Sequence, residues 1–200
     1  MWERLWEEGR TPWDQGESSK SLQDLVTEGI LPPGRALVPG AGAGHDILTL
    51  ASEHRHCTGL DLSPLAVDRF KRLREERGIP EEWAELVVAD FFEWEPGLRF
   101  DVIFDYTFLC AIQPEMRVSW AERMSQLLAP GGQLVTLIFP TAPPHGEEGS
   151  PPFLTTPEQV RQLLVPAFTQ LSLAPAKRSV PSREGREWLG RWTLSEPLQP

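Results

Sequence analysis

Residues 36–46 read ALVPGAGAGHD, an apolar run followed by three glycines at alternate positions and then by helical spacing. Ala36–Val38 is short and apolar, which predicts a buried strand. Gly40, Gly42 and Gly44 permit a tight turn and a close approach of the backbone to a ligand. A helix that follows at once presents free N–H groups to that ligand. The stretch therefore predicts a strand, a ligand-binding turn and a helix in succession.

Short apolar runs and helical patterns alternate along the rest of the chain. The predicted helices are Lys20–Glu28, Asp46–Glu53, Pro64–Arg77, Pro114–Leu128 and Pro157–Leu164. The further predicted strands are Thr58–Leu60, Leu86–Ala89, Asp101–Phe104, Gln133–Phe139, Thr169–Leu173 and Trp188–Leu194, with a turn at Pro130-Gly131-Gly132. This alternation predicts an α/β fold, a mostly parallel sheet with helices on both faces and an antiparallel edge formed by the last two strands. The proline-rich loop Pro140–Pro152 is either a lid or a surface connection.

Length and composition predict one domain over residues 1–200. Hydrophobic residues make up 40% of the chain and charged residues 24%, and no apolar run approaches the roughly 20 residues of a membrane-spanning helix. The formal net charge of -10 opposes binding to nucleic acid and favours a small-molecule partner. The charged residues 1–8 are unlike a signal peptide, and Cys57 and Cys110 are too few for a disulfide framework or a thiolate metal site. We therefore expect a cytoplasmic protein without a metal.

An acidic residue stands at the end of the next predicted strand. Asp61 lies 21 positions after Gly40, close to the roughly 20 expected for an acid that binds ribose hydroxyls. Its carboxylate would repel a 2′-phosphate, so an adenosine without that phosphate is favoured. The alternative is that Asp61 only caps the helix beginning at Ser63-Pro64. His45 occupies the place of the third glycine of a dinucleotide turn, which disfavours NAD but leaves an NAD-dependent reductase as an alternative.

Further side chains follow other strands at the same edge of the predicted sheet. Asp90 is placed to accept a hydrogen bond from an adenine amino group, with Phe91 or Phe92 against the adenine ring. Asp105 and Tyr106 follow the fourth strand. Because open parallel sheets bind ligands at the carboxyl ends of their strands, we expect one crevice there. The predicted cofactor residues of this crevice are Gly40, Gly42, Gly44, Asp61, Leu62, Asp90, Phe91 and Asp105.

A first set of features resembles the class I S-adenosylmethionine-dependent methyltransferases: the glycine turn, Asp61, Asp90 and Pro130-Gly131-Gly132 before a strand. Two longer motifs sharpen the resemblance, WERLW and TPWDQG within residues 2–16 and FDYTFLCAI at residues 104–112. The ending GREWLGRW at residues 185–192 agrees with them. Over almost its whole length the chain resembles the thiopurine S-methyltransferase superfamily, and within it the thiol and halide methyltransferases.

The resemblance implies a Rossmann-like methyltransferase fold with S-adenosyl-L-methionine as the cofactor. It also implies that residues 1–34 cap the cofactor, with Trp2, Trp6 and Trp13 closing over it. Aromatic faces stabilise a cation such as a sulfonium by about 0.5–2 kcal/mol without competing for its methyl group. The alternative is that these rings only pack. The implied reaction is in-line transfer of the methyl group to a soft nucleophile, namely a thiol, bisulfide, thiocyanate or halide, with release of S-adenosylhomocysteine.

An anionic nucleophile needs a local positive potential in a chain of this net charge. The resemblance places Arg117 and Arg183 near the crevice as substrate residues, although arginines are more often exposed. Tyr106 lies beside the crevice and either donates a hydrogen bond to the substrate, shields the methyl group or packs in the core. Soft anions need alignment and desolvation but no strong base, so no catalytic residue is predicted.

Two other functions stay open at this point. An O- or N-methyltransferase acting on a small metabolite needs a general base, which folding could supply from His54, His56 or His145. A non-catalytic protein that binds S-adenosylmethionine has the same fold. We expect a cap or turn role for His45, and buried packing for Cys110.

Overall fold

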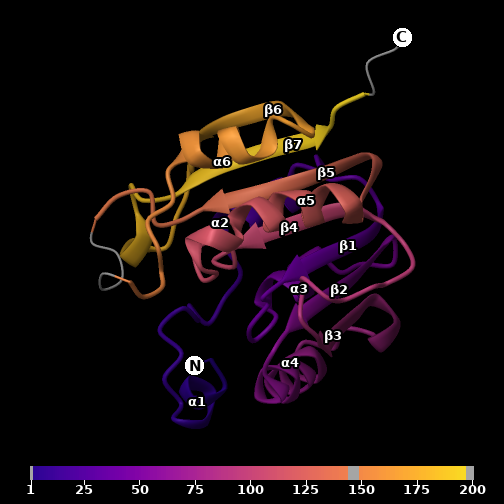
Figure 1. The fold of residues 1–200 in the computed structure, drawn as a ribbon. Coiled ribbons are helices and arrows are strands. Elements are labelled where there is room, and N and C mark those ends of the chain that lie inside the picture. Colours follow the sequence, from indigo (N-terminus) through magenta and orange to yellow (C-terminus); the bar gives the residue numbers. More distant parts are fainter. Residues whose placement is uncertain (1, 144–148, 197–200) are drawn as a thin grey trace.

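The computed structural model of the chain describes residues 2–143 and 149–196. They form a seven-stranded sheet with the order β3-β2-β1-β4-β5-β7-β6 (Figure 1). The strands are β1 (Gly34–Pro39), β2 (Arg55–Asp61), β3 (Ala84–Val88), β4 (Phe100–Tyr106), β5 (Leu128–Ile138), β6 (Phe168–Pro175) and β7 (Trp188–Leu194). Strands β1 to β5 run parallel, and β7 pairs antiparallel with β5 and β6. The predicted α/β fold with an antiparallel edge is confirmed.

Helices cover both faces of the sheet. They are α1 (Trp2–Glu7), α2 (Lys20–Thr27), α3 (His45–Leu50), α4 (Pro64–Glu76), α5 (Arg117–Leu127) and α6 (Pro157–Leu164), with the short 3-10 helices η1 (Glu81–Trp83), η2 (Pro114–Met116) and η3 (Pro181–Arg183). Ala36 and Val38 belong to a core shared with α2, α3 and α4, whereas Leu37 belongs to a core shared with α5 and α6. Successive strand residues face opposite sides, so this apolar run is buried on both.

Two predicted helices differ from the structure. The helix predicted over Asp46–Glu53 ends at Leu50, because Ser52 leaves the helix and forms an isolated antiparallel bridge with Arg55. The helix predicted over Pro114–Leu128 is divided into η2 and α5. In both cases the local apolar spacing is helical. The bridge to Arg55 sets the end of the first helix, and a change from 3-10 to α-helix at Arg117 divides the second.

The predicted turn at Pro130-Gly131-Gly132 lies inside β5. The helix before it does end, at Leu127, but β5 begins directly at Leu128. Its pairing with β4 then shifts between Phe100↔Leu128 and Val102↔Gln133, so the extra residues form an irregularity in the strand. The turn-forming residues therefore interrupt the pairing of β5 with β4 near the start of β5 without ending the strand.

The strand order reverses direction between β1 and β4. From β1 the chain proceeds outward through β2 and β3, and then returns to β4 and β5 on the other side. Such a switch point leaves a crevice beyond the carboxyl ends of the strands, where ligands bind in open α/β sheets. Among the described helices none is long and apolar enough to cross a membrane.

Candidate functional site

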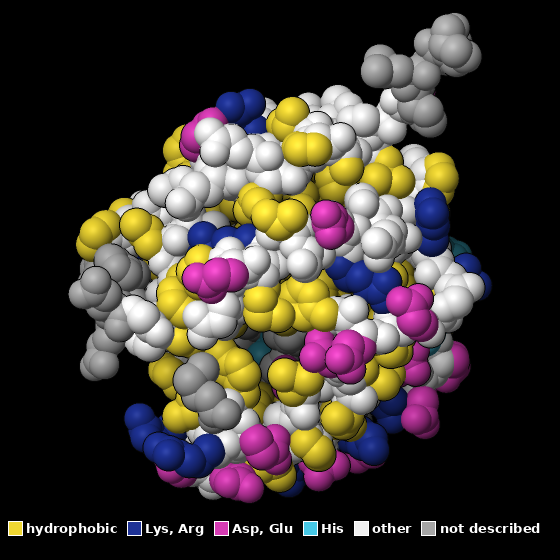
Figure 2. Space-filling view, viewed as in Figure 1, with side chains coloured by type: hydrophobic (Ala, Val, Ile, Leu, Met, Phe, Trp, Pro, Cys, Tyr) yellow, Lys and Arg dark blue, Asp and Glu magenta, His cyan; other side chains and the backbone are white. Residues whose placement is uncertain are grey.

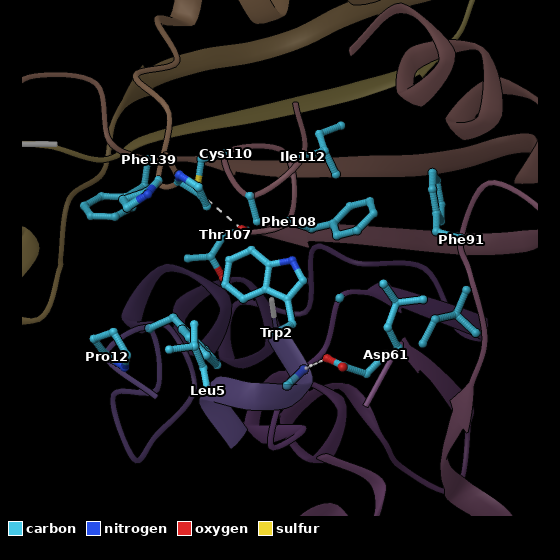
Figure 3. Close-up of a pocket in the computed structure, with 18 of the residues that line it drawn as sticks. Trp2, Leu5, Pro12, Asp61, Phe91, Thr107, Phe108, Cys110, Ile112 and Phe139 are labelled. Atoms are coloured by element: carbon cyan, nitrogen blue, oxygen red, sulfur yellow. Dashed lines mark hydrogen bonds between the residues drawn. The ribbon is translucent and has the colours of Figure 1, made fainter. Parts of the chain in front are cut away.

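A cavity of about 680 Å³ lies at the carboxyl ends of the parallel strands (Figure 3). Pockets of about 300–1,000 Å³ hold small molecules and cofactors. Its walls come from the N-terminal segment, the glycine turn, the residues after β2 to β5, residues 150–152 and η3. The predicted crevice is therefore present, and segments from both ends of the chain enclose it.

Asp61 joins the glycine turn to the start of α4. Its Oδ2 accepts a hydrogen bond of 2.9 Å from the N–H of Gly42, and its Oδ1 accepts one of 2.9 Å from the N–H of Ser63. Asp61 also lines the cavity. Burial raises the pKa of this carboxyl, while the backbone hydrogen bonds act to lower it. Asp61 thus holds Ser63, the N-cap residue of α4, and also faces the cavity, and its binding of ribose hydroxyls stays a prediction.

The three glycines of the turn have different surroundings. Gly40 and Gly42 line the cavity, and a Cβ added to Gly42 would meet nothing closer than Nε1 of Trp13 at 3.7 Å. Gly44 does not line it. A Cβ on Gly44 would stand 2.4 Å from Cδ2 of Phe70, so this glycine allows α3 to pack closely against α4. Two predicted cofactor residues therefore face the cavity, and the third serves packing.

The end of β3 supplies an aromatic wall. Phe91 is buried, and its ring contacts those of Phe92 and Phe108 at centroid distances of 5.3 and 5.2 Å. Asp90 is exposed at the rim, where its Oδ1 accepts a hydrogen bond of 2.9 Å from the N–H of Phe92. Leu62 is 58% exposed on the same rim. All five residues line the cavity.

The predicted tryptophans gather over the glycine turn. Trp2 and Trp6 each contact the ring of Trp13 edge to face, with centroids 5.2 and 6.0 Å apart. All three indoles also line the cavity. They therefore pack on one another and present aromatic surface to a ligand, so packing and ligand contact are compatible here.

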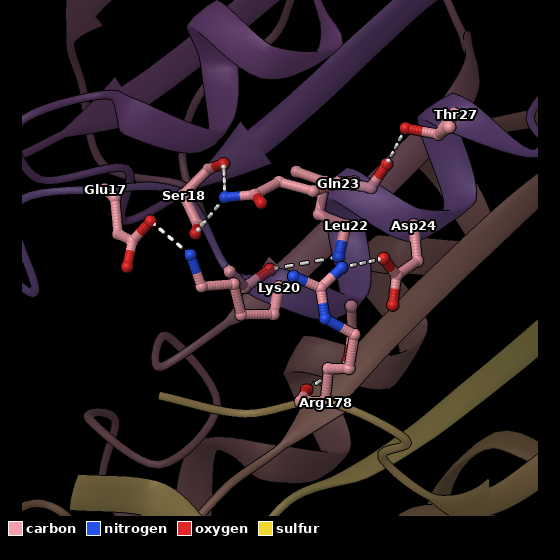
Figure 4. A network of polar contacts seen from close by, with 10 residues as sticks. Glu17, Ser18, Lys20, Leu22, Gln23, Asp24, Thr27 and Arg178 are labelled. Atoms are coloured by element: carbon pink, nitrogen blue, oxygen red, sulfur yellow. Dashed lines mark hydrogen bonds and ion pairs between the residues drawn. The ribbon is translucent and has the colours of Figure 1, made fainter. Parts of the chain in front are cut away.

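The N-terminal segment is fastened at several points. The N–H of Ser19 donates to Oδ1 of Asp46 at 3.0 Å, and Nε2 of His45 lies 3.1 Å from Oδ1 of Asp14. The contact with His45 lowers the pKa of Asp14, and burial raises that of Asp46 to about 6. Figure 4 shows a further ion pair, between Arg178 and Asp24 of α2. His45 is thus the first residue of α3, after the N-cap Gly44, and it holds the segment through Asp14 instead of capping the helix.

Asp105 is not on the cavity wall. It is 3% exposed, and its oxygens accept hydrogen bonds from the N–H of Leu109 at 3.2 Å and from Nε1 of Trp120 at 2.8 Å. Burial raises its pKa to about 6. The structure thus gives this predicted cofactor residue another position: it fixes the turn after β4 and anchors α5.

Arg183 brings a positive charge to the cavity. Its side chain is stacked between two rings, with Cζ 4.9 Å from the centroid of Tyr106 and 4.6 Å from that of Phe139. Nη2 donates a hydrogen bond of 2.8 Å to the carbonyl of Trp13. Arg183 is 4% exposed and lines the cavity, yet Nη1 has no hydrogen-bond partner within the described part of the chain. The unpaired Nη1 is itself buried, so an anion in the cavity can pair with it only after a neighbouring side chain moves, whereas the charge of the guanidinium already acts at the cavity wall.

Tyr106 and Arg117 lie behind the cavity wall. The Tyr106 hydroxyl donates to the buried carboxylate of Glu187, and burial raises the pKa of this phenol. Arg117 donates from Nη2 to Oγ1 of Thr155 at 2.9 Å and to the carbonyl of Leu154 at 3.3 Å. Neither residue is among those that line the cavity. Of the three predicted substrate residues, Arg183 alone reaches it.

Two residues near Arg183 were not predicted as site residues. Glu187 lies in the quoted ending of the chain, but nothing in its spacing indicates a bond to Tyr106. Phe139 directly follows β5, so the rule that places ligands at strand ends would have included it.

Cys110 lines the cavity but is buried, and burial raises the pKa of its thiol to about 12. His145 and the middle of the loop Pro140–Pro152 lie outside the described residues, while Pro151 and Pro152 line the cavity.

Comparison with known proteins assigns this site to a family. The sequence model of the thiopurine S-methyltransferases matches residues 1–195. The chain belongs to the thiopurine S-methyltransferase family. It is 43% identical over 196 residues to the probable thiol methyltransferase 2 of Arabidopsis thaliana, covering 97% of this chain and 84% of that protein. It is 42% identical over 193 residues to thiocyanate methyltransferase 1 of Brassica oleracea, covering 96% and 83%.

A solved structure agrees on the fold. An S-adenosylmethionine-dependent methyltransferase from Clostridium acetobutylicum superposes with a TM-score of 0.70 at 12% identity, over 90% of this chain and 93% of that one. The predicted fold, enzyme class and cofactor are confirmed: the chain is an S-adenosylmethionine-dependent methyltransferase. The findings support methyl transfer to a soft nucleophile and do not favour an oxygen or nitrogen acceptor.

The residues of the cavity fit this cofactor. Asp61, Gly42 and the three tryptophans all line the cavity, and Gly42 lies beside both Asp61 and Trp13. Carboxylate oxygens accept hydrogen bonds from ribose hydroxyls, and indole faces attract a sulfonium.

Proposed function

We propose that the cavity divides into two halves. The cofactor half comprises Gly40, Gly42, Asp61, Leu62, Asp90, Phe91 and the three tryptophans, and holds S-adenosylmethionine under a cap formed by residues 1–34. The acceptor half comprises Phe139, Pro151, Pro152 and Arg183, and holds a thiolate, bisulfide, thiocyanate or halide ion. We further propose that the enzyme acts in the cytoplasm, where its two buried free cysteines stay reduced.

The observation that carries this proposal is the buried guanidinium of Arg183 with its free Nη1. Leaving a buried charged donor without an acceptor costs more than about 1–3 kcal/mol, so an anionic ligand is the natural partner. The acidic side chains scattered over the face in Figure 2, and the net charge of -10, give such an anion no general attraction. Arg183 supplies the attraction locally.

For this reaction the protein mainly has to place the acceptor in line with the methyl group of the cofactor. Bound S-adenosylmethionine supplies a methyl group on a sulfonium, and a lone pair of the acceptor forms the new bond to that carbon while the old carbon–sulfur pair stays on the cofactor sulfur. Arg183 orients the acceptor, and the aromatic and proline side chains exclude water from it.

The test incubates the purified enzyme with S-adenosylmethionine and, separately, iodide, thiocyanate, bisulfide and an aromatic thiol. Release of S-adenosylhomocysteine, together with the methylated product, identifies the acceptor. We expect Arg183→Met to lower kcat/KM for that acceptor by about 100-fold, as loss of a buried charge-assisted hydrogen bond predicts. Arg186→Met is the matched control, because Arg186 stacks on Phe139 at 5.1 Å but does not line the cavity.

A second control separates the acceptor site from the cap. Ser182→Ala removes the 3.0 Å hydrogen bond from Ser182 to Oε1 of Gln15 and leaves Arg183 in place. If Arg183→Met and Ser182→Ala lose activity equally, Arg183 acts only by fastening the N-terminal segment. If no soft anion supports turnover although S-adenosylhomocysteine stabilises the protein, the acceptor assignment fails, and oxygen and nitrogen acceptors or binding alone become the candidates.

A further inference from the structure

Thr107 has a backbone conformation that its side chain disfavours. Twelve glycines in the described chain adopt positive φ, and Thr107, at φ 66°, is the one described non-glycine residue that does. A left-handed conformation costs an L-residue free energy, and a β-branched residue is a genuine outlier there. Strain of this kind persists mainly at functional sites. Every other described residue with a positive φ is a glycine, so the threonine side chain requires a reason.

The side chain of Thr107 is held in one orientation. Its Oγ1 donates a hydrogen bond of 2.6 Å to the carbonyl of Tyr106. Its own carbonyl accepts a bond of 3.3 Å from the Cys110 thiol. Thr107 lines the cavity, so a rigid side chain faces the ligand space.

The sheet places Thr107 between the two halves of the cavity. It follows β4, which lies between β1 with its glycine turn and β5 with Phe139 at its end. Figure 3 shows Thr107 between Phe139 on one side and Phe108 and Asp61 on the other. Its neighbours diverge: Tyr106 lies under Arg183, whereas Phe108 packs against Phe91. Residues two apart in an extended strand share a face, so the left-handed turn at 107 creates this divergence.

We propose that Thr107 contacts the reacting groups, where it keeps the methyl group of the cofactor and the incoming acceptor on one line. This inference rests on the proposed function for the position of the acceptor beside Arg183. In-line displacement is sensitive to alignment, and a misplacement of about 1 Å costs roughly 100-fold in rate. A fixed side chain at the boundary between the two halves restricts the positions that the methyl group and the acceptor can adopt. The left-handed backbone is the consequence of bringing that side chain to this point.

The test compares three substitutions of Thr107. Thr107→Gly relieves the strain and removes the side chain, and Thr107→Asn keeps a side chain that tolerates the left-handed region but changes its shape. Thr107→Ser keeps the hydroxyl that bonds to the Tyr106 carbonyl. For each variant, kcat and KM with the acceptor are measured at saturating S-adenosylmethionine, with the S-adenosylhomocysteine Kd and the unfolding midpoint.

For Thr107→Gly and Thr107→Asn we expect a kcat at least tenfold lower, an S-adenosylhomocysteine Kd within threefold of the native value and an unfolding midpoint equal or higher. Thr107→Ser retains kcat within threefold. A Thr107→Gly enzyme with native kcat overturns the proposal. So does a variant whose stability, Kd and kcat fall together, since the residue then only shapes the turn. If Thr107→Gly loses activity while Arg183→Met keeps full activity, the assignment of the acceptor to Arg183 is wrong. The role of Thr107 in alignment is then still supported.

Discussion

The two halves of the cavity differ in how their charged groups are satisfied. In the cofactor half, both oxygens of Asp61 already accept backbone hydrogen bonds, from Gly42 and Ser63. In the acceptor half, Arg183 is buried with Nη1 unpaired within the described chain. The carboxylate of the proposed cofactor half is therefore paired within the protein, and we propose that the guanidinium of the acceptor half is paired by its ligand. Changes in the cofactor half should alter stability and cofactor affinity, and changes in the acceptor half should alter turnover.

The largest effect is expected for Gly44→Ala, which tests how tightly α3 packs against α4 behind the cofactor half. The new Cβ would stand 2.4 Å from Phe70 at a φ of 80°. We expect the free energy of unfolding to fall by roughly 3 kcal/mol or more, from the left-handed backbone and from overpacking together. Urea unfolding measures it. Gly29→Ala is the control, since Gly29 has φ 64° and nothing within 4 Å of an added Cβ, so it should lose only about 1–2 kcal/mol. Equal losses would show that α3 does not depend on this close contact.

Asp61→Ala should come next, with an S-adenosylhomocysteine Kd raised by about 100-fold. The change removes a charged acceptor worth about 1.5–3 kcal/mol for each hydrogen bond it makes to a ligand. Calorimetric titration gives the Kd. Asp90→Asn, at the exposed rim, should weaken binding by less than tenfold. If the two variants bind alike, Asp61 serves the glycine turn and not the ribose.

Among the residues that line the cavity, the sequence predicted more of the proposed cofactor half than of the proposed acceptor half, and the reason lies in sequence separation. The glycine turn, Asp61 and Asp90 each follow a strand directly, so local pattern and the rule for strand ends suffice to bring them together. Arg183 reaches the cavity from 170 residues beyond Trp13, whose carbonyl it binds. Such contacts depend on how η3 packs, which no local pattern encodes. The family resemblance, carried by long motifs, supplied Arg183 instead.

Arg117 and Asp105 show the opposite error, because the sequence predicted both at the cavity and the structure places both away from it. Both stand close in sequence to residues that line the cavity, but the side chains turn away to bind Thr155 and Trp120. A buried polar group takes the partner that tertiary packing offers. The place of a residue after a strand therefore predicts the region in which its side chain lies. The hydrogen-bond partner of that side chain then decides whether the side chain faces the ligand.

Arg117→Met should produce a smaller effect, confined to the acceptor half. Arg117 holds Leu154 and Thr155, next to the cavity residues Pro151 and Pro152. Losing a charge-assisted hydrogen bond of about 1.5 kcal/mol should lower kcat/KM for an aromatic thiol roughly tenfold, and for iodide less, because the smaller ion does not reach that wall. The S-adenosylhomocysteine Kd should stay native. As the control, Thr155→Val removes one hydrogen-bond partner of Arg117 and should cause about half the loss in transition-state stabilisation. An unchanged ratio of kcat/KM for the thiol to kcat/KM for iodide in Arg117→Met would contradict this role of Arg117.

The smallest effect is the pH dependence of stability that the buried carboxyl of Asp105 produces. The pKa of Asp105 is about 6 in the native state, against 3.8 in the unfolded chain. Between these values the native state holds the extra proton, so the free energy of unfolding falls as pH rises, and it levels off above pH 6. Asp105 alone should contribute a decline of about 1 kcal/mol between pH 5 and pH 6. Asp46, with a pKa also of about 6, acts in the same direction. Urea unfolding of Asp105→Asn across this range should therefore show a shallower decline than the native enzyme, and an identical slope would mean that the buried Asp105 carboxyl stays ionised.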